Sequence, residues 1–591
     1  MAKTLLPTRW TLRHLLAAPK GAPLRRVTTQ LERSVRALEA LRPLLADNIK
    51  AADLTRMLRL TEELAAAASR IRAYAGLWFS ENTQDQAALA FQGRIQQITT
   101  DARNRVLFFS LWWKGLPAPA AARLLAASPR ELRHYLALER KATPHVLPER
   151  DEQLLNIKDV NGVNGLTTVY SMLTNAYKFN LLVNGDAKQL TRDALMASVR
   201  KADPALRAAA YQELYRVYAE DGLVLAQIYT HRVRDWHAEN VKLRGYRAAV
   251  AVRNLDNDIP DPVIATLLRT CRKNRTVFQR WFRVKARLLG LKKLRRYDIY
   301  APLSGAEKTY PYDQAVKLVL DTFQKFSPAV ARAARRVFDE NQIDAEVRPG
   351  KRGGAFCASV LPGMTPYVLQ NYTGDVRDVA TLAHELGHAI HSMLAARHSV
   401  FTFHSALPLA ETSSTFAEML LTDRLLAQDR DPAVRRQLIA DTLDDAYATI
   451  MRQAYFTLFE QQAHKLIQSG AGTDELNAAY MRNLREQFGS AVEVAPEFKW
   501  EWVSIPHIFY TPFYCYAYSF GQLLVLALYQ RYKKQGARFT PHYLKILAYG
   551  GSASPQHILE EAGIDITKPM FWQGGFDFIS GLLDELESGL D

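Results

Sequence analysis

Cysteine is scarce in this sequence of 591 residues. Only Cys271, Cys357 and Cys515 occur, and no two of them form a CxxC pair. Disulfide-stabilised proteins have many more cysteines for their length, so a disulfide scaffold is excluded. Three scattered thiols also cannot form a thiolate zinc site on their own. This cysteine usage is typical of a reduced protein, and we expect a cytoplasmic location.

Long apolar runs are absent as well. A helix that crosses a bilayer needs ~18 to 20 apolar residues, and the longest candidates, residues 106–113 and 520–529, are far shorter. The sequence therefore predicts a soluble or peripheral protein with no membrane partner. The first acidic residue is Glu32, and an acid-free start weakly resembles an organellar transit peptide. Trp10, the early prolines and the low serine content argue against that alternative.

The charge is unbalanced, with 76 Lys+Arg against 60 Asp+Glu and a formal net charge of +16. A nucleic-acid-binding protein concentrates its basic residues in a stripe or a recognisable module. Here the basic residues are spread along the chain, with modest clusters at 292–296 and 348–352. We therefore expect a solvated surface of mixed charge and no nucleic-acid partner. If the charge has a function, we expect it to act locally, by favouring acidic peptides or free carboxyl ends.

Strand-like alternation is also scarce, while apolar residues recur at spacings of three and four in many segments. Leu31, Val35 and Leu38 are an example, separated by strong helix formers. We expect a mostly α-helical body. The predicted helical stretches are 27–75 with a break at Pro43, 85–116, 120–142, 192–238, 262–288, 329–340 and 435–468.

Two segments interrupt the helical pattern. Residues 179–190 contain Asn184-Gly185 between short apolar runs, which indicates a two-residue hairpin. Residues 350–375 contain a glycine-rich loop, a short strand, a Pro-Gly turn and a second strand. The softest boundary lies between 185 and 205, so we expect an N-terminal helical lobe at 1–190 and a catalytic domain at 191–591.

A His-Glu-x-x-His motif follows the second of these segments. Asp375 is a plausible N-cap for a helix that starts at Val376. His384 and His388 are four residues apart, about 40° apart around a helix, so both imidazoles can reach one metal ion. Glu385 is offset by about 100° and can reach a metal-coordinated water without being a ligand.

A catalytic zinc site needs three protein ligands and an open position for water. The metzincin extension HExxHxxGxxH is absent, because His391 occupies the glycine position. Glu411 lies 23 residues after His388, on a second predicted helix, and Glu418 follows seven residues later on the same face. We predict Glu411 as the third ligand and Glu418 as the partner that orients a ligand histidine. The reversed assignment of these two glutamates stays open.

These segments resemble the M3 family of zinc metallopeptidases, and within it the oligoendopeptidase F group. The resemblance begins at Arg9-Trp10-Thr-Leu and spans nearly the whole chain. It rests on the motifs Gly350-Lys-Arg-Gly-Gly-Ala-Phe, Thr381-Leu-Ala-His-Glu-Leu-Gly-His-Ala-Ile-His, Ala410-Glu-Thr-Ser-Ser-Thr-Phe-Ala-Glu, Ile505-Pro-His507 and Gly550-Gly-Ser-Ala-Ser-Pro-Gln-His. It implies a large helical ellipsoid of the neurolysin and thimet oligopeptidase type, with a deep central channel and a small β segment beside the HExxH helix. It also implies one zinc ion per chain and short peptides as substrates.

The resemblance further implies that a histidine and a tyrosine stabilise the oxyanion of the reaction. His507 matches that histidine, and Tyr514 and Tyr516 best fit the Tyr-x-Tyr pattern that follows it. These two tyrosines would point about 200° apart on an ideal helix, so one of them would act. The alternative is that Tyr510, Tyr514 and Tyr518, spaced by four, form a packed aromatic stripe.

The predicted function is zinc-dependent hydrolysis of internal peptide bonds in short oligopeptides, with Glu385 as the general base. The strands near 355–372 could pair with the substrate backbone. A zinc aminopeptidase is an alternative, although the nearest string, Gly363-Met364-Thr365, lacks the Gly-x-Met-Glu-Asn segment of those enzymes. A basic helical nucleic-acid-binding protein is the non-enzymatic alternative.

Overall fold

The protein is described by a computed structural model that covers residues 6–183, 185–303 and 309–588. The chain divides into two compact units, each made of three separate segments. The first unit contains Met1–Thr143, Glu307–Leu425 and Arg531–Ile564, and the second contains Pro144–Ala306, Leu426–Gln530 and Asp565–Asp591. Both units include residues from either side of position 190. They follow a different division from the expected lobe at 1–190, which stays a prediction.

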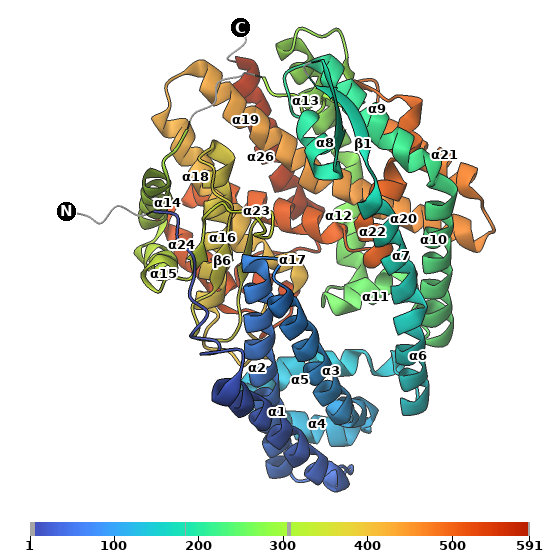
Figure 1. Ribbon diagram of the computed structural model, residues 1–591, viewed down its shortest axis with the longest axis vertical. Helices are drawn as coiled ribbons and strands as arrows, with labels where there is room; N and C mark the ends of the chain where they lie inside the picture. Colours follow the sequence, from blue (N-terminus) through green and yellow to red (C-terminus); the bar gives the residue numbers. More distant parts are fainter. Residues whose placement is uncertain (1–5, 184, 304–308, 589–591) are drawn as a thin grey trace. The chain divides into compact units, whose positions relative to one another are not determined.

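The first unit is helical with one small sheet (Figure 1). Its helices are α1 (Gly21–Leu41), α2 (Ala51–Glu81), α3 (Gln86–Gly115), α4 (Ala118–Ala127), α5 (Arg133–Lys141), α14 (Tyr312–Phe326), α15 (Pro328–Asp339), α16 (Val376–Leu394), α17 (Leu407–Ala410), most of α18 (Thr412–Gln428), α24 (Thr540–Ala548) and α25 (Pro555–Glu560). Its strands are β4 (Ile343–Asp344), β5 (Phe356–Ala358) and β6 (Tyr367–Leu369).

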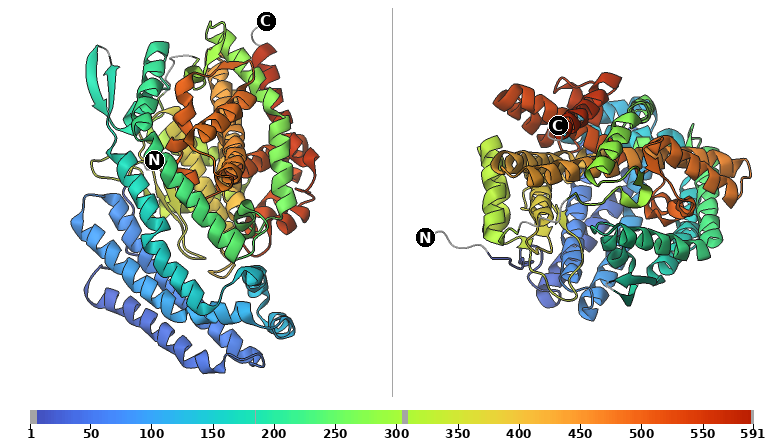
Figure 2. Two further views of the ribbon diagram at one scale, coloured as in Figure 1. Left: turned by 90° about the vertical axis from the view of Figure 1, so that its right-hand side faces the viewer. Right: turned by 90° about the horizontal axis from the view of Figure 1, so that it is seen from above.

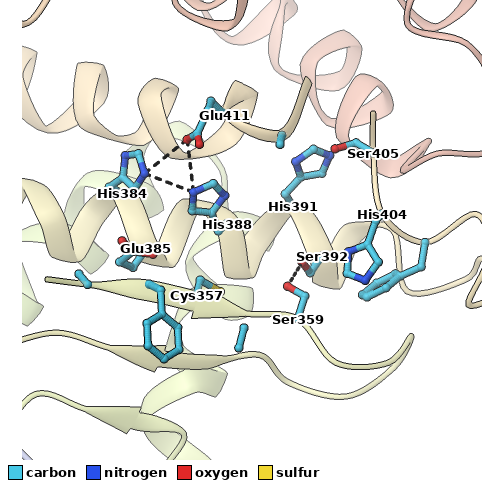
Figure 3. Close-up of a pocket in the computed structure, with 15 residues that line it drawn as sticks. Cys357, Ser359, His384, Glu385, His388, His391, Ser392, His404, Ser405 and Glu411 are labelled. Atoms are coloured by element: carbon cyan, nitrogen blue, oxygen red, sulfur yellow. Dashed lines mark hydrogen bonds and ion pairs between the residues drawn. The ribbon is translucent and has the colours of Figure 1, made fainter. Parts of the chain in front are cut away.

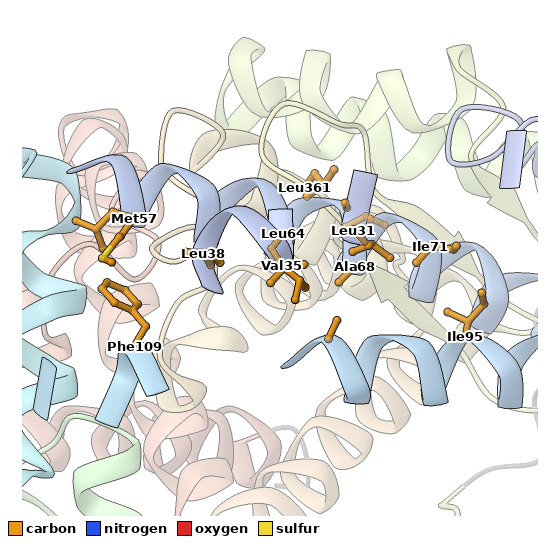
Figure 4. Close-up of a cluster of buried hydrophobic side chains, with 14 of the residues drawn as sticks. Leu31, Val35, Leu38, Met57, Leu64, Ala68, Ile71, Ile95, Phe109 and Leu361 are labelled. Carbon is orange, nitrogen blue, oxygen red and sulfur yellow. The ribbon is translucent and has the colours of Figure 1, made fainter. Parts of the chain in front are cut away.

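Helices α1, α2 and α3 lie side by side and share an apolar core (Figure 4). Leu31, Val35 and Leu38 are buried in this core, as their spacing of three and four predicts. The break expected at Pro43 is confirmed, because the short 3-10 helix η1 (Arg42–Leu44) separates α1 from α2. The Asp85 carboxylate accepts hydrogen bonds from two amides of the first turn and caps α3.

The small sheet has the strand order β4-β6-β5 and lies against α16. β5 and β6 pair antiparallel, as the strand, Pro-Gly turn and strand pattern of 350–375 predicts, while β4 pairs parallel to β6. β5 is therefore an edge strand, and one side of its backbone pairs with no described strand. The prediction of a small β segment beside the HExxH helix is confirmed.

The second unit contains most of the remaining helices. They are α6 (Glu149–Asn161), α7 (Val163–Ala176), α8 (Arg192–Ser198), α9 (Pro204–Glu220), α10 (Gly222–Trp236), α11 (Ala249–Asp256), α12 (Asp261–Lys273), α13 (Arg275–Leu288), α19 (Pro432–Ala446), α20 (Arg452–Gln468), α21 (Thr473–Phe488), α22 (Pro506–Tyr510), most of α23 (Tyr516–Gln535) and α26 (Pro569–Ser588). The π-helix η4 (His237–Leu243) extends α10, and the π-helix η6 (Tyr447–Met451) precedes α20. The 3-10 helix η7 (Pro496–Ser504) precedes α22.

The second unit also contains the predicted hairpin (Figure 2). β1 (Phe179–Val183) and β2 (Asp186–Leu190) pair antiparallel, and Gly185 has a φ of +87° that glycine adopts readily. Asn184, the other residue of the predicted turn, lies outside the described residues. A parallel pair, β3 (Leu294–Arg295) and β7 (Val492–Glu493), completes the strands of this unit. Within the part of the chain that the structure describes, no helix has the length and apolar content to cross a membrane.

Candidate active site

The HExxH helix is α16, and its start is fixed by two aspartates. The Asp375 carboxylate accepts a hydrogen bond from the amide of Asp378 at 2.9 Å, which confirms the predicted N-cap. The Asp378 carboxylate in turn accepts from the amides of Thr373 and Gly374 at 2.6 and 2.8 Å. The first bond satisfies an amide that the helix start leaves without an intrahelical partner, and the other two fix the chain just before the N-cap. Val379, Leu382 and Leu386 are buried on the opposite face from the motif histidines.

Three potential ligand atoms from two parts of the first unit converge on one point (Figure 3). Nε2 of His384 lies 3.2 Å from Nε2 of His388, and Oε2 of Glu411 lies 3.4 and 3.3 Å from these two nitrogens. Ligands at about 2.0 to 2.1 Å from a tetrahedral zinc ion are separated by about 3.3 Å. The three spacings therefore fit three corners of such a tetrahedron, and the donor set of two imidazoles and one carboxylate suits zinc.

Glu418 contacts the opposite nitrogen of His384. Nδ1 of His384 donates to Oε1 of Glu418 at 2.5 Å, so that in the neutral ring Nε2 is the acceptor that faces His388. Burial lowers the pKa of His384, but the hydrogen bond and the charge of Glu418 outweigh burial and raise that pKa to about 9. The arrangement corresponds to the predicted division of roles, with Glu411 beside both histidines and Glu418 behind one of them.

Glu411 lies at the break between α17 and α18 rather than inside one continuous helix. The buried Ser414 hydroxyl donates to Oε2 of Glu411 at 2.7 Å. Burial raises the pKa of Glu411, but the hydrogen bond with His388 and the charges of His388 and His384 outweigh it and lower that pKa to about 2. The carboxylate is therefore ionised at neutral pH.

Gly387 allows α16 to approach the start of α18 closely. A Cβ atom at this position would lie 2.5 Å from Cα of Ser414 and 2.7 Å from the carbonyl oxygen of Ser413. No side chain fits in that space unless the two backbones move apart. His391, one turn further on, is buried, and its imidazole lies beside the backbone of Ala410. Gly387 and His391 thus hold the segment that carries Glu411 against α16.

Glu385 is buried beside the two motif histidines, with 6% of its surface exposed. Its Oε2 atom has no hydrogen-bond partner among the described residues. Burial raises the pKa of Glu385, and the charges of His384 and His388 oppose that effect. A buried carboxylate with an unsatisfied oxygen is suited to accept a proton from a water molecule beside it.

These residues line a cavity of about 590 Å³. One wall is α16, and the opposite wall is the edge strand β5 with Phe356, Cys357 and Ala358 (Figure 3). The cavity continues past the candidate metal-ligand cluster of His384, His388 and Glu411 to Ser359, Ser392, Phe403, His404 and Ser405. All the residues that line it belong to the first unit.

His507 and the candidate tyrosines belong to the second unit. His507 lies on α22, and its ring stacks on that of Tyr514 with 5.9 Å between centroids. Tyr518 meets both rings edge-on. Burial lowers the pKa of His507, which favours the neutral imidazole. The catalytic roles of these residues stay predictions.

Tyr516 differs from Tyr514 in its surroundings. It is fully buried, and its hydroxyl accepts a hydrogen bond from the side-chain amide of Asn257 at 2.8 Å. Tyr514 precedes α23 instead of lying on the same helix as Tyr516, because Phe513 has a φ of +59° and interrupts the helical path. The ideal-helix geometry used for this pair is therefore wrong, and so is a continuous helical stripe through Tyr510. Of the two, Tyr514 is the better candidate for contact with a substrate.

The sequence did not reveal three residues that shape this site: Gly387, His391 and Ser414. Gly387 and His391 act on a segment that comes next to α16 only when the chain folds, so the sequence around them gives no sign of the contact. Ser414 follows Glu411 by three residues, a spacing that permits the contact, but serine is too common for that spacing to be a signal.

The helical fold and the His-Glu-x-x-His helix with a nearby glutamate define the class as a metallopeptidase. The family model of peptidase family M3 matches residues 197–578, and this chain belongs to that family. The match lies within the catalytic domain expected at 191–591.

Similar proteins agree with this assignment. The Group B oligopeptidase PepB of Streptococcus agalactiae is 29% identical over 454 residues, which are 75% of this chain and 74% of that protein. The chromosomal oligoendopeptidase F of Lactococcus lactis subsp. cremoris is 28% identical over 415 residues, 69% of this chain and 68% of that protein. A protein of known crystal structure from Chlamydophila abortus has the same fold, with a TM-score of 0.87, 24% identity and coverage of 98% of both chains. The chain is a metallo-oligoendopeptidase that acts on peptides.

Proposed function

We propose that this enzyme binds one zinc ion per chain through His384, His388 and Glu411 and cleaves internal bonds of short peptides. The observation that carries the proposal is the convergence of the three ligand atoms at 3.2 to 3.4 Å from one another. Two histidines and a glutamate with an open fourth position form the ligand set of a catalytic zinc site. The scarcity of cysteine supports a reducing, cytoplasmic location.

A bound zinc ion supplies Lewis-acid chemistry, because it makes a coordinated water acidic near neutral pH and polarises the substrate carbonyl. Glu385 accepts the proton of the attacking water on its unsatisfied oxygen. The same carboxyl group then delivers this proton to the leaving amine, so that Glu385 acts first as base and then as acid. Glu418 keeps His384 in the tautomer whose Nε2 lone pair faces the ligand cluster.

The edge strand β5 offers a place for the substrate backbone. Its residues line the cavity opposite α16, and an extended peptide that pairs with an edge strand gains main-chain hydrogen bonds that do not depend on side chains. Such pairing lets an enzyme accept many sequences while holding the scissile bond at a fixed place.

His507 and Tyr514 are the proposed donors to the oxyanion. A neutral imidazole and a phenol each carry one donor hydrogen, which is the group that an oxyanion requires. Their stacked rings fix their mutual orientation within the second unit. Replacement of either residue should lower kcat by about 10²-fold or more while KM and zinc content change little.

The proposal is tested by mass spectrometry of the products from a mixture of peptides of graded length, some with a blocked amino terminus. We expect internal cleavage of blocked peptides, loss of cleavage with a chelator, and one equivalent of zinc per chain in metal analysis. Release of single amino-terminal residues from unblocked peptides alone would instead support an aminopeptidase. Undiminished cleavage by protein without metal would refute the proposed zinc site.

A further inference from the structure

We propose that the part of the cavity beyond the metal-ligand cluster is a specificity subsite for an uncharged polar side chain of the substrate. We call it the polar subsite, and it consists of Ser359, Ser392, His404 and Ser405. The proposal rests on the proposed function, because it assigns a preference to the same cavity. The side chains that fit the polar subsite are those of serine, threonine, asparagine and glutamine, at a substrate position near the cleaved bond.

The position of the polar subsite follows from α16. Ser392 comes four residues after His388 on this helix, and four residues advance about 6 Å along a helix axis. An extended peptide advances about 3.3 Å per residue. Figure 3 shows Ser392, Ser359 and His404 at one end of the pocket and His384 with Glu385 at the other. The polar subsite therefore reads the side chain one or two residues away from the scissile bond.

The lining of the polar subsite is rich in hydrogen-bonding groups. The hydroxyls of Ser359 and Ser392 share one hydrogen bond across the cavity wall. Two hydroxyls that share one bond keep one donor hydrogen and several acceptor lone pairs for a ligand. Ser405 adds a third hydroxyl to the same end. A polar side chain loses its water on entering and finds replacement partners here, whereas an apolar side chain leaves these hydroxyls without partners.

His404 is the group most open to a ligand. Its side chain is exposed to the cavity that it lines, and no group of the described residues forms a hydrogen bond with its ring nitrogens. Partial removal from water lowers the pKa of His404 and favours the neutral ring. A neutral imidazole offers one donor and one acceptor, which matches an amide or a hydroxyl.

The polar subsite contains no charged side chain. A substrate carboxylate or ammonium group would lose hydration there without gaining an ion pair, which is costly. The nearest carboxylates in the cavity, those of Glu385 and Glu411, lie at its other end beside the proposed zinc position. The preference expected from the overall charge, for acidic peptides, therefore does not apply at this position.

The wall that carries His404 is held by a glycine pair. The amide of Gly551 donates to the carbonyl of Thr402 at 2.9 Å. A Cβ atom on Gly551 would lie 2.2 Å from the carbonyl oxygen of His404, and one on Gly550 would lie 2.5 Å from that of Phe403. Only glycine permits this approach, so the backbone of the wall is fixed before a substrate arrives. A preorganised wall discriminates between side chains better than a mobile one.

The test compares kcat/KM for peptides that differ at one position within two residues of the cleaved bond. Asparagine is compared with leucine, and threonine with valine, because these pairs have nearly the same shape. We expect zinc-loaded wild-type enzyme to prefer the polar member by about tenfold at one of these positions. His404→Leu should abolish that preference or reverse it, while His404→Gln should retain part of it. His542→Leu, at an exposed histidine on α24 outside the cavity, should keep the wild-type preference.

Zinc content and the thermal unfolding midpoint are measured for each variant. If His404→Leu does not fold, Ser392→Ala takes its place and should reduce the preference about threefold or more. An unchanged ratio in a folded, zinc-loaded variant, or a wild-type preference for the apolar member, would refute the polar subsite and leave the proposed function intact. If zinc-loaded wild-type enzyme cleaved no peptide at all, the proposed function and the polar subsite would both be refuted.

Discussion

Nδ1 of His384 lies 2.5 Å from Oε1 of Glu418, on the side of the imidazole opposite Glu411. One glutamate therefore faces the ligand point and the other fixes the tautomer and the direction of the ring. A histidine held in this way is a better ligand, because the carboxylate both orients the ring and increases its basicity.

The first prediction concerns this contact. Glu418→Ala should lower the affinity for zinc by about 10- to 100-fold, and Glu418→Gln should lower it less, because the amide oxygen can still accept the hydrogen bond. Competition with a chelator of known strength measures the affinity. Glu63→Ala, at an exposed position on α2, is the matched control. Wild-type affinity in Glu418→Ala would contradict the assigned role.

The second prediction concerns the close approach at Gly387. Gly387→Ala should destabilise the fold by about 1 to 3 kcal/mol through overpacking. It should also weaken zinc binding, because the segment with Glu411 has to move away from α16. Gly93→Ala on α3 is the control, since a Cβ there meets no atom within 4 Å, and it should stabilise the helix by about 0.5 to 1 kcal/mol. Thermal unfolding and metal analysis report both effects, and an unaltered zinc content in Gly387→Ala would disprove the second.

A third prediction comes from Glu460, a buried residue of α20. Its Oε1 accepts a hydrogen bond from the backbone amide of Phe513 at 2.9 Å. Phe513 has a positive φ and lies between His507 and Tyr514 in the sequence. Its Oε2 has no partner among the described residues. Burial raises the pKa of Glu460 to about 8, although the Phe513 amide opposes that shift.

Between about pH 4.5 and about pH 8, the folded protein therefore keeps a proton on Glu460 that the unfolded chain, with a pKa of 4.5, has lost. Stability should fall as pH rises from about 4.5 to about 8, with a slope of up to about 1.4 kcal/mol per pH unit. Glu460→Gln should remove this contribution, so the difference in stability between variant and wild type should grow in favour of the variant toward pH 8. This difference in stability is measured from the unfolding midpoints of both proteins, freed of metal with a chelator, at several pH values. Parallel profiles for the two proteins would rule the effect out.

A fourth prediction concerns a buried cluster of charges. One carboxylate oxygen of Glu501 accepts from Arg296 at 2.6 Å and from Arg452 at 2.9 Å, and Glu501 is 1% exposed. Glu501→Gln leaves the buried guanidinium of Arg296 and the partly exposed one of Arg452 without their anion and should cost about 3 to 5 kcal/mol. Glu220→Gln, which removes the exposed partner of Arg216, should cost less than about 1 kcal/mol. Comparable losses in both variants, measured by denaturant unfolding, would argue against the cluster as a source of stability.

Periodicity predicted part of the helices, because apolar spacing directly reports a buried face, but α14, α21 and α26 lie in no predicted stretch. The stretch 85–116 corresponds to α3 almost to the residue. The stretch 192–238 is instead three helices, α8, α9 and α10, because Pro204 opens a new helix and Asp221 interrupts the next. Hydrophobic spacing continues across such breaks, so it does not reveal them.

The proposed pair of histidine ligands could be recognised in the sequence because the helix itself brings His384 and His388 together. The distance from Glu411 to that pair depends on the turn between α17 and α18 and on the space left by Gly387, which are tertiary features. The ideal-helix geometry assumed for Tyr514 and Tyr516 is wrong for a local reason. A left-handed residue, Phe513, interrupts the helix there, and phenylalanine carries no sequence signal for that conformation.

The most direct test of the account is Glu385→Gln. The substitution removes the proton acceptor and preserves the size of the side chain, and Glu385 is not among the three convergent ligand atoms. The variant should bind one equivalent of zinc with wild-type affinity, while kcat for peptide cleavage falls by about 10²- to 10⁴-fold or more. A zinc-loaded Glu385→Gln enzyme that cleaves peptides at the wild-type rate would contradict the account.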